Sequence, residues 1–313
     1  MNNGTMIKNF DELLSHAATL PPKRVVVVFP SNRETFEAIA QACELLPVVF
    51  DLVGDPEIMR EQWPTLPSDG NRIVLHEALG THEALALALR LVREGRGDIL
   101  MKGGIDTSTM MRMVLQEASG IRLGRLLSDI FLMEYPQRPE NRFIMITDGG
   151  MTLAPDLQNK IELIRNAVDV AHALGNQMPK VAILSATEFV VPKLPSTLDA
   201  AALAKMNQRG QIKGCVVDGP LALDNAISEE AAAEKGIDSP VAGRAEILVA
   251  ANIESANSLA KSTIYFGNLR LAHVIVGGRV PILIPSRVDR KDAKLLSIAL
   301  GMIMSEFERT NSD

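Results

Sequence analysis

Short runs of β-branched residues alternate with amphipathic helical stretches along almost the whole chain, and this alternation restricts the possible folds most strongly. The runs at residues 24–29 and 48–53 predict strands. Residues 81–94 have the spacing of a helix, which Gly95 ends. Alternating strands and helices are typical of βα units, in which helices cover a parallel sheet. The sequence therefore predicts an α/β fold with mostly parallel sheets.

Further segments of both kinds continue this pattern. The other predicted strands are residues 71–75, 98–101, 143–147, 180–184, 214–217, 246–250, 274–276 and 282–284. A capping box at Ser31–Glu34 predicts the start of a helix that reaches Leu45, and Pro155 predicts the start of another helix. The remaining predicted helices are residues 255–265 and 291–307. Because one core stops growing near about 250–300 residues, 313 residues predict two lobes with a cleft between them.

Composition excludes several classes of protein. The formal net charge of −6 and the lack of a Lys/Arg run argue against nucleic-acid binding. Neither Cys43 nor Cys215 has a CxxC partner, and the five His residues lack metal-ligand spacing, so we expect no metal site. The first 22 residues contain no continuous apolar run, which indicates neither a signal peptide nor a membrane anchor. We therefore expect a cytoplasmic protein that binds no membrane.

Polar residues follow four of the predicted strands. They are Lys102, Asp148, Asp218 and Ser286. The carboxyl ends of the strands of an open α/β sheet are where ligands bind, so this coincidence favours a shared site.

Three motifs at these positions could carry chemistry. In MKGGIDTST, residues 101–109, glycines and helix-opening hydroxyls beside Lys102 suit an anion, although a plain helix cap fits as well. In VDGPLALD, residues 217–224, an ordinary turn with proline opening a helix is the simpler interpretation. In PSRVDRKD, residues 285–292, a hydroxyl and a guanidinium could hold an oxyanion beside a carboxylate base, or form a charged helix cap.

The sequence of residues 208–228, QRGQIKGCVVDGPLALDNAIS, closely resembles a segment of phosphate butyryltransferases. The resemblance extends over about residues 98–305 and includes 122–128, 154–174, 237–243, 257–261 and the Ser-Arg pair at 286–287. The chain thus resembles the phosphate acetyltransferase and butyryltransferase family, and the butyryl branch is the more similar.

This resemblance implies two α/β/α lobes like those of isocitrate and isopropylmalate dehydrogenases, with the active cleft between them. The end of the chain would return to the first lobe, so the lobes would be residues 1–141 plus 284–313 and residues 142–283. It implies reversible transfer of a short acyl group, butyryl or branched-chain, between coenzyme A and phosphate. Acyl-CoA would be a substrate, with no tightly bound cofactor and no metal. The relatives imply a homodimer or a larger homo-oligomer.

The resemblance also assigns roles to residues. Ser286 and Arg287 would polarise the acyl carbonyl and hold phosphate, and an aspartate would take the thiol proton. Acetyl-branch enzymes have this base seven residues after the serine, where this chain has Ala293, so Asp292 is the first choice and Asp289 the second. The substrate-binding residues would be Lys102, Thr107, Ser108, Thr109, Arg125, Ser128, Asp148, Asp218, Gly219, Pro220, Asn257 and Lys261. Thr152 stands where relatives usually carry asparagine, which puts one polar contact near Asp148 in question.

Three alternatives stay open from the sequence. The acyl group could be acetyl, since one methylene changes discrimination by only about 1–3 kcal/mol. A non-catalytic sensor of acyl-CoA or phosphate would fit the alanine at position 293. A metal-dependent dehydrogenase could use the same fold, but the sequence shows no cluster of carboxylates or histidines for its metal.

Overall fold

The computed structural model describes residues 6–65, 72–138, 142–286 and 291–311. The chain divides into two compact units. Unit 1 comprises Met1–Asn9 and Ser128–Leu271, and unit 2 comprises Phe10–Leu127 and Ala272–Asp313. These divisions lie near, but not at, the positions after residues 141 and 283 that the sequence predicts.

Unit 2 contains a sheet whose strands run in the order β3-β2-β1-β4-β11-β10. The strands are β1 (Lys23–Val28), β2 (Val48–Gly54), β3 (Ile73–Glu77), β4 (Ile99–Lys102), β10 (Leu271–Val276) and β11 (Ile282–Leu283). All neighbours pair in parallel except β10, which is antiparallel to β11. The helices are α1 (Phe10–Ala17), α2 (Arg33–Leu45), α3 (Pro56–Gln62), α4 (Thr81–Arg93), α5 (Thr107–Val114) and α11 (Lys291–Asn311), with the 3₁₀ turn η1 (Glu117–Ser119).

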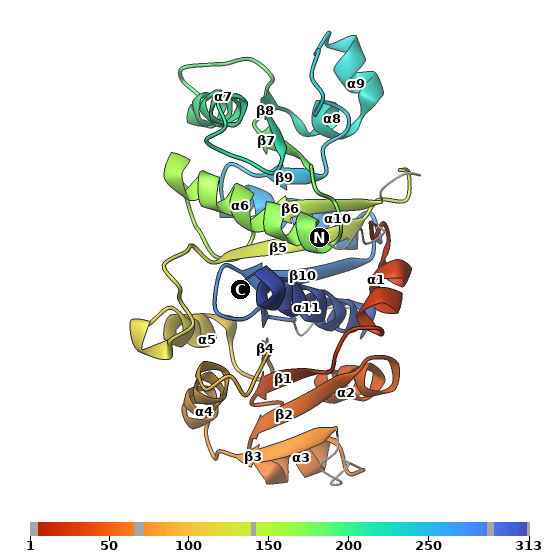
Figure 1. The fold of residues 1–313 in the computed structure, drawn as a ribbon, viewed down its shortest axis with the longest axis vertical. Coiled ribbons are helices and arrows are strands. Elements are labelled where there is room, and N and C mark those ends of the chain that lie inside the picture. The colour runs from red at the N-terminus through yellow and green to blue at the C-terminus, as the bar shows by residue number, and fades with distance from the viewer. Residues whose placement is uncertain (1–5, 66–71, 139–141, 287–290, 312–313) are drawn as a thin grey trace. The chain divides into compact units, whose positions relative to one another are not determined.

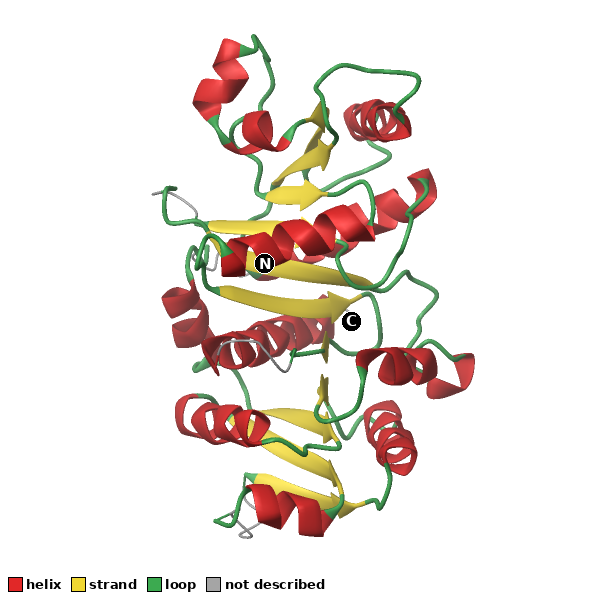
Figure 2. Ribbon diagram, turned by 180° about the vertical axis from the view of Figure 1, so that it is seen from behind, coloured by secondary structure: helices red, strands yellow, loops and turns green. Residues whose placement is uncertain are grey.

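Helices cover both faces of this sheet. Helix α4 packs on β1, β2 and β4, and α5 packs beside α4. Helices α2 and α11 pack together, α2 on β2 and α11 on β4 and β11. In Figures 1 and 2, α4 and α5 lie on one side of β1–β4 and α2 on the other. The connection after β1 therefore leads to one face of the sheet, and the connection after β4 leads to the opposite face.

Unit 1 contains strands in the order β5-β6-β9-β7-β8. They are β5 (Ser128–Glu134), β6 (Phe143–Thr147), β7 (Lys180–Leu184), β8 (Val216–Leu221) and β9 (Ile247–Val249). Only β5 is antiparallel to its neighbour β6. The helices are α6 (Leu157–Ala173), α7 (Pro195–Gln208), α8 (Leu223–Ile227), α9 (Glu229–Glu234) and α10 (Ile253–Tyr265). The fold class, α/β with mostly parallel strands, is confirmed.

Most predicted elements are present, with small differences at their ends. Helix α6 begins after Asp156, whose side chain accepts a hydrogen bond from the Asn159 amide in a capping box, so Pro155 precedes the cap. The predicted capping box at Ser31 is wrong. Asn32 caps α2 instead, because its side chain accepts from the Thr35 amide at 2.9 Å.

The prediction that Asp218, Gly219 and Pro220 form a turn after a strand is also wrong. These residues lie within β8, and α8 begins only at Leu223. Strand β8 is at the end of the strand order, and its pairing with β7 shifts register between Ala182 and Leu184. A proline is tolerated in an edge strand beside such an irregularity, because no ladder hydrogen bond from its nitrogen is needed there.

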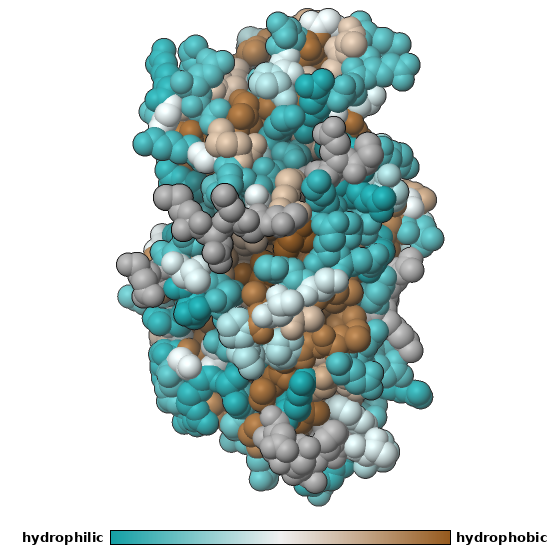
Figure 3. All heavy atoms as spheres, turned by 45° about the vertical axis from the view of Figure 1, so that its right-hand side comes forward, coloured by the Kyte–Doolittle hydropathy of each residue, from teal (hydrophilic) through white to brown (hydrophobic). Residues whose placement is uncertain are grey.

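Apolar side chains fill the layers between sheets and helices. Large residues such as Phe50, Leu100 and Met110 are completely buried. Hydrophilic residues cover most of the face drawn in Figure 3, and apolar residues show between them. None of the helices in the described part of the chain has the length and apolar character that crossing a membrane requires.

Candidate functional site

Two of the predicted site segments leave the same edge of the unit 2 sheet. Strand β11 pairs in parallel with β4, with Ile282 opposite Leu100 and Leu283 opposite Met101. Ser286 follows β11 and is exposed, and Lys102 is the last residue of β4. The Ser286 segment and the Lys102 turn therefore both emerge at the carboxyl edge of two neighbouring parallel strands. Arg287 and Asp289 lie outside the described residues.

This edge is also where the sheet changes the direction of its connections. The chain after β1 goes on to α2, and the chain after β4 goes on to α5 on the opposite face of the sheet (Figure 1). Ligands of open α/β sheets bind at such a point. The geometry of unit 2 thus favours the Lys102 turn as part of a ligand site.

The two glycines after Lys102 serve packing rather than an open anion loop. The Gly103 and Gly104 amides donate to the carbonyls of Val28 and Phe29 at 2.9 and 2.7 Å. A Cβ at Gly103 would come within 2.5 Å of the Val28 carbonyl oxygen, and one at Gly104 within 1.8 Å of Ser31 Oγ. The glycines let the turn after β4 lie directly against the loop after β1, which places Ser31 at the same edge.

Lys102 itself is 5% exposed, and its ammonium donates to the carbonyl oxygens of Gly103 and Ile105 at 3.4 and 3.3 Å. These long contacts orient the side chain along its own turn. The cation expected at this edge thus contacts backbone carbonyls of the MKGGIDTST motif.

Asp106 changes the interpretation of the hydroxyl-rich turn. Its carboxylate caps α5, accepting from the Thr109 amide and the Ser108 hydroxyl, each at 2.7 Å. The hydrogen bonds from Thr109 and Ser108 hold the pKa of Asp106 below its usual range. An incoming phosphate would compete with this carboxylate for both donors. Thr107 remains exposed on the same turn, as does Arg125 in the segment before unit 1.

The candidate base Asp292 lies in the first turn of α11 and is half-buried. Ala293, at the position where acetyl-branch enzymes carry their aspartate, is only 7% exposed. Asp292 therefore reaches solvent, whereas the side chain of Ala293, one residue later, faces the protein interior.

In unit 1 the structure joins Asp148 to a compact turn. Asp148 directly follows β6, and its two carboxylate oxygens accept from four backbone amides at 2.8–3.1 Å. These donors are the amides of Asp129, Gly150, Met151 and Thr152. The contact with residue 152 uses its backbone, so it does not depend on whether threonine or asparagine stands there.

A second carboxylate raises the proton affinity of this group. Asp148 is 3% exposed, and Asp129, in β5, is 1% exposed. Burial, together with the charge of Asp129, raises the pKa of Asp148 to about 6, although the amides favour its ionised form. Sequence reasoning did not single out Asp129, because it lies inside a strand that was not predicted.

Asn257 and Ser128 attach other elements to this turn. The Asn257 side chain, on α10, donates to the Gly149 carbonyl at 2.9 Å, and Lys261 is exposed one helical turn later. Ser128 is fully buried, and its hydroxyl accepts from the Asn166 side chain of α6 at 2.6 Å. The structure therefore brings Asp148, Asn257 and the start of β5 together. Asp218, paired with Ala182 inside the sheet, is not among them.

Cys215 is not placed for nucleophilic chemistry. Burial raises the pKa of the Cys215 thiol to about 11, so almost no thiolate forms at neutral pH. Within the described ranges, no three His, Cys, Asp or Glu side chains are grouped as metal ligands would be.

Comparison with known proteins identifies the family. The family model described as "Phosphate acetyl/butaryl transferase" matches residues 65–302. A phosphate butyryltransferase of Clostridium beijerinckii is 41% identical over 300 residues, covering 96% of this chain and 99% of that protein. A phosphate acetyltransferase of Thermotoga maritima is 41% identical over 301 residues, covering 95% of this chain and 100% of that protein.

A solved structure agrees with these sequence relatives. The crystal structure of a branched-chain phosphotransacylase from Enterococcus faecalis V583 superposes with a TM-score of 0.79 at 30% identity, covering 90% of this chain and 99% of that one. The resemblance that the DGPLALDNAIS segment carries is thereby confirmed. The chain belongs to the phosphate acetyl/butaryl transferase family of acyltransferases.

Proposed function

We propose that this enzyme transfers a short acyl group, butyryl or branched-chain, reversibly between coenzyme A and inorganic phosphate. The relatives named for butyryl transfer and for branched-chain transacylation support this acyl class. The parallel pairing of β4 and β11 supports a site for this reaction, because Ser286 and Lys102 follow these strands at one edge of unit 2.

The proposed reaction is a direct transfer. The thiol of coenzyme A has a pKa of about 8.5, so a carboxylate base raises the share of thiolate during attack. The thiolate sulfur attacks the acyl phosphate carbonyl, the C–S bond forms, the C–O bond to phosphate breaks, and the base keeps the thiol proton. Ser286 and Arg287 stabilise the oxyanion. Donors in that role contribute roughly 3–4 kcal/mol each.

The test of this activity is phosphate-dependent thiol release. The protein is mixed with butyryl-CoA and phosphate, and the free thiol is followed with a chromogenic disulfide. We expect release with phosphate and none when phosphate is omitted. The same assay with acetyl-CoA and isobutyryl-CoA ranks the acyl groups by kcat/KM. Absence of release with every acyl-CoA would reject the proposal.

The base is tested separately. Asp292 lies in the described first turn of α11, whereas Asp289 does not belong to the described residues. We expect Asp292→Asn to lower kcat by two orders of magnitude or more, the usual contribution of a positioned base. Asp289→Asn is the matched control and should keep most of the activity. The reverse ranking would make Asp289 the base.

A further inference from the structure

Lys294 is a buried cation that no described residue neutralises. It is 3% exposed, as are Lys23 and Lys160. Lys23 binds Glu306 at 2.7 Å and Lys160 binds Asp199 at 2.6 Å. No hydrogen bond or ion pair joins the Lys294 ammonium to any residue in the described part of the chain.

The Lys294 ammonium nevertheless reaches solvent. Among the described residues, the side-chain oxygen and nitrogen atoms sealed from solvent without a hydrogen bond are Glu134 Oε2, Thr147 Oγ1 and Asn225 Oδ1. Lys294 Nζ is not one of them, so its aliphatic stem is buried while the charged end keeps a small contact with solvent. Its positive charge is therefore both largely buried and without a partner among the described residues.

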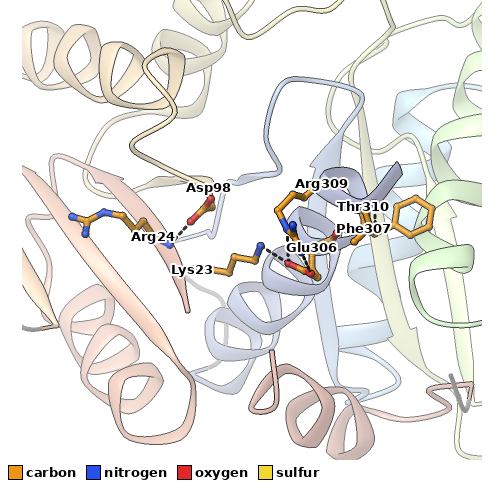
Figure 4. Close-up of polar contacts among 7 residues, drawn as sticks. All are labelled: Lys23, Arg24, Asp98, Glu306, Phe307, Arg309 and Thr310. Atoms are coloured by element: carbon orange, nitrogen blue, oxygen red, sulfur yellow. Dashed lines mark hydrogen bonds and ion pairs between the residues drawn. The ribbon is translucent and has the colours of Figure 1, made fainter. Parts of the chain in front are cut away.

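The direction of α11 places this charge. Near the end of α11, Glu306 binds Lys23, the first residue of β1, so this end of the helix lies at the amino edge of the strands (Figure 4). Gly301 faces the sheet, since a Cβ there would lie 3.3 Å from Leu283 and 3.5 Å from Ile99. Lys294 precedes Gly301 by seven residues, or two turns and about 10 Å, on the same stripe of the helix.

Lys294 therefore lies on the sheet-facing side of α11, toward the carboxyl edge of β4 and β11. Ser286 leaves β11 at this edge, and the chain reaches α11 within a few residues. The Lys102 turn leaves β4 at the same edge. Charges buried without a partner are costly, and native proteins normally pair them. The missing partner of Lys294 is therefore an anion that comes from outside the protein.

We propose that Lys294 binds a phosphate group of a substrate at the carboxyl edge of unit 2. This inference rests on the proposed function, which requires two substrates that carry phosphate. A lysine ammonium is a compact charge that pairs well with phosphate oxygens. The group is either inorganic phosphate, together with the phosphoryl end of the acyl phosphate, or a phosphate of coenzyme A.

Three variants test the role of the charge. Lys294→Met keeps the length of the side chain and removes the charge, and Lys294→Arg retains the charge. Lys160→Met is the matched control, because Lys160 is an equally buried lysine whose partner is Asp199 in unit 1. Each protein is studied by thermal unfolding without ligand and with inorganic phosphate, coenzyme A or pantetheine, and by the thiol-release assay.

Binding is the first readout, since it does not require activity. We expect Lys294→Met to unfold at the same or a higher temperature than the wild type without ligand, because an unpaired buried charge is removed. We expect it to bind one phosphate-bearing ligand at least about tenfold more weakly, with Lys294→Arg restoring part of the affinity. Lys160→Met should unfold earlier, since it leaves Asp199 unpaired, and should bind the same ligands normally.

The ligand that loses affinity identifies the source of the phosphate. A loss for inorganic phosphate alone assigns Lys294 to the phosphate co-substrate, and the KM for phosphate should rise by the same factor. A loss for coenzyme A, with binding of phosphate-free pantetheine unchanged, assigns it to a coenzyme A phosphate. If Lys294→Met lowers stability and leaves every affinity unchanged, the inference is wrong. A wild type that binds these ligands through Lys294 but releases no thiol would contradict only the proposed reaction.

Discussion

At the scale of single residues, Asp148 combines two opposing influences. Four backbone amides hold its carboxylate in place, while burial and Asp129 raise its pKa to about 6 from an ordinary value of 3.8. A Cβ at Gly150 would come within 2.5 Å of Asp129 Oδ2, so this turn fits closely around both acids. The residue that fixes the turn is thus also the one that responds to pH near neutrality.

The raised pKa of Asp148 predicts a pH-dependent stability. Between pH 4 and 6 the folded protein holds a proton that the unfolded chain has released, so this group makes the protein less stable as pH rises. Asp148→Asn removes the titration. We expect the unfolding free energy of the wild type minus that of the variant to fall by on the order of 3 kcal/mol between pH 4 and 7.

Chemical denaturation at several pH values measures this difference. Asp148→Asn also disturbs the hydrogen bonds to the turn, but that offset does not vary with pH over this range. A constant difference from pH 4 to 7 would show that Asp148 has an ordinary pKa in the folded protein.

At the scale of elements, the loops after β1 and β4 form one packed unit. The Gly103 and Gly104 amides bind the carbonyls of the chain leaving β1. Phe29, in this chain, has a φ of 50°, a left-handed conformation that costs a residue with a side chain of order 1 kcal/mol or more. The hydrogen bond from Gly104 to the Phe29 carbonyl holds that conformation. The shape of this edge therefore depends on both loops together.

Gly103→Ala should disrupt the packing of the loop after β4 against the loop after β1. The new methyl group would lie within 2.8 Å of three backbone atoms of Val28 and Pro30, which cannot rotate away as a side chain could. We expect a loss of about 2–3 kcal/mol in unfolding free energy, as for other overpacked sites. Gly80→Ala is the control, because nothing lies within 4 Å of a Cβ there, and should cost about 1 kcal/mol or less as a weaker helix cap. Equal losses in the two variants would contradict the packing argument.

The same elements show what the sequence could and could not predict. Apolar runs such as those of β2 and β6 identify buried strands directly, because local pattern and burial agree. Strand β5 is buried along almost its whole length, yet Asp129 and Glu134 interrupt its apolar pattern. Helix α7 is rich in alanine and lacks a clear apolar stripe. In both cases tertiary packing, which the local sequence does not show, determines the structure.

The candidate site divides in a similar way. Strand ends predicted the positions of Lys102, Asp148 and Ser286, because parallel strands carry their loops to one edge. The contacts made there could not be predicted. Asp106 occupies hydrogen-bond donors that the sequence led us to expect for phosphate. Lys294 is buried among the core residues of α11, and the sequence does not show whether its charge has a partner there. Contacts of this kind depend on how segments far apart in sequence meet.

At the scale of the whole molecule, each compact unit is built from two separate pieces of chain. In unit 2, residues 272–313 return to the part of the chain formed by residues 10–127, where β11 pairs with β4 and α11 packs on both strands. Lys23 and Glu306, 283 residues apart, form an ion pair where this last helix ends against β1 (Figure 4). The position of α11 matters for function, because Asp292 and Lys294 both lie in its first two turns.

The Lys23–Glu306 pair predicts how firmly this closing helix is held. Hydrogen bonds from Arg309 and Lys23 lower the pKa of Glu306 to about 2, from an ordinary 4.5. Its contribution to stability is therefore complete above pH 4.5 and is lost as pH falls toward 2. At pH 7 we expect Glu306→Gln to lower the unfolding free energy by about 1–3 kcal/mol, because Lys23 stays buried without a counter-charge.

A control separates this effect from the loss of any surface charge. Glu37→Gln removes the exposed helical pair with Arg33 and should change stability by less than about 0.5 kcal/mol. Urea denaturation at pH 7 and pH 3 compares both variants with the wild type, and the deficit of Glu306→Gln should shrink at the lower pH. A deficit of the same size at both pH values would mean that Glu306 acts through packing. The ion pair would then not be what fastens the end of the chain to its first strand.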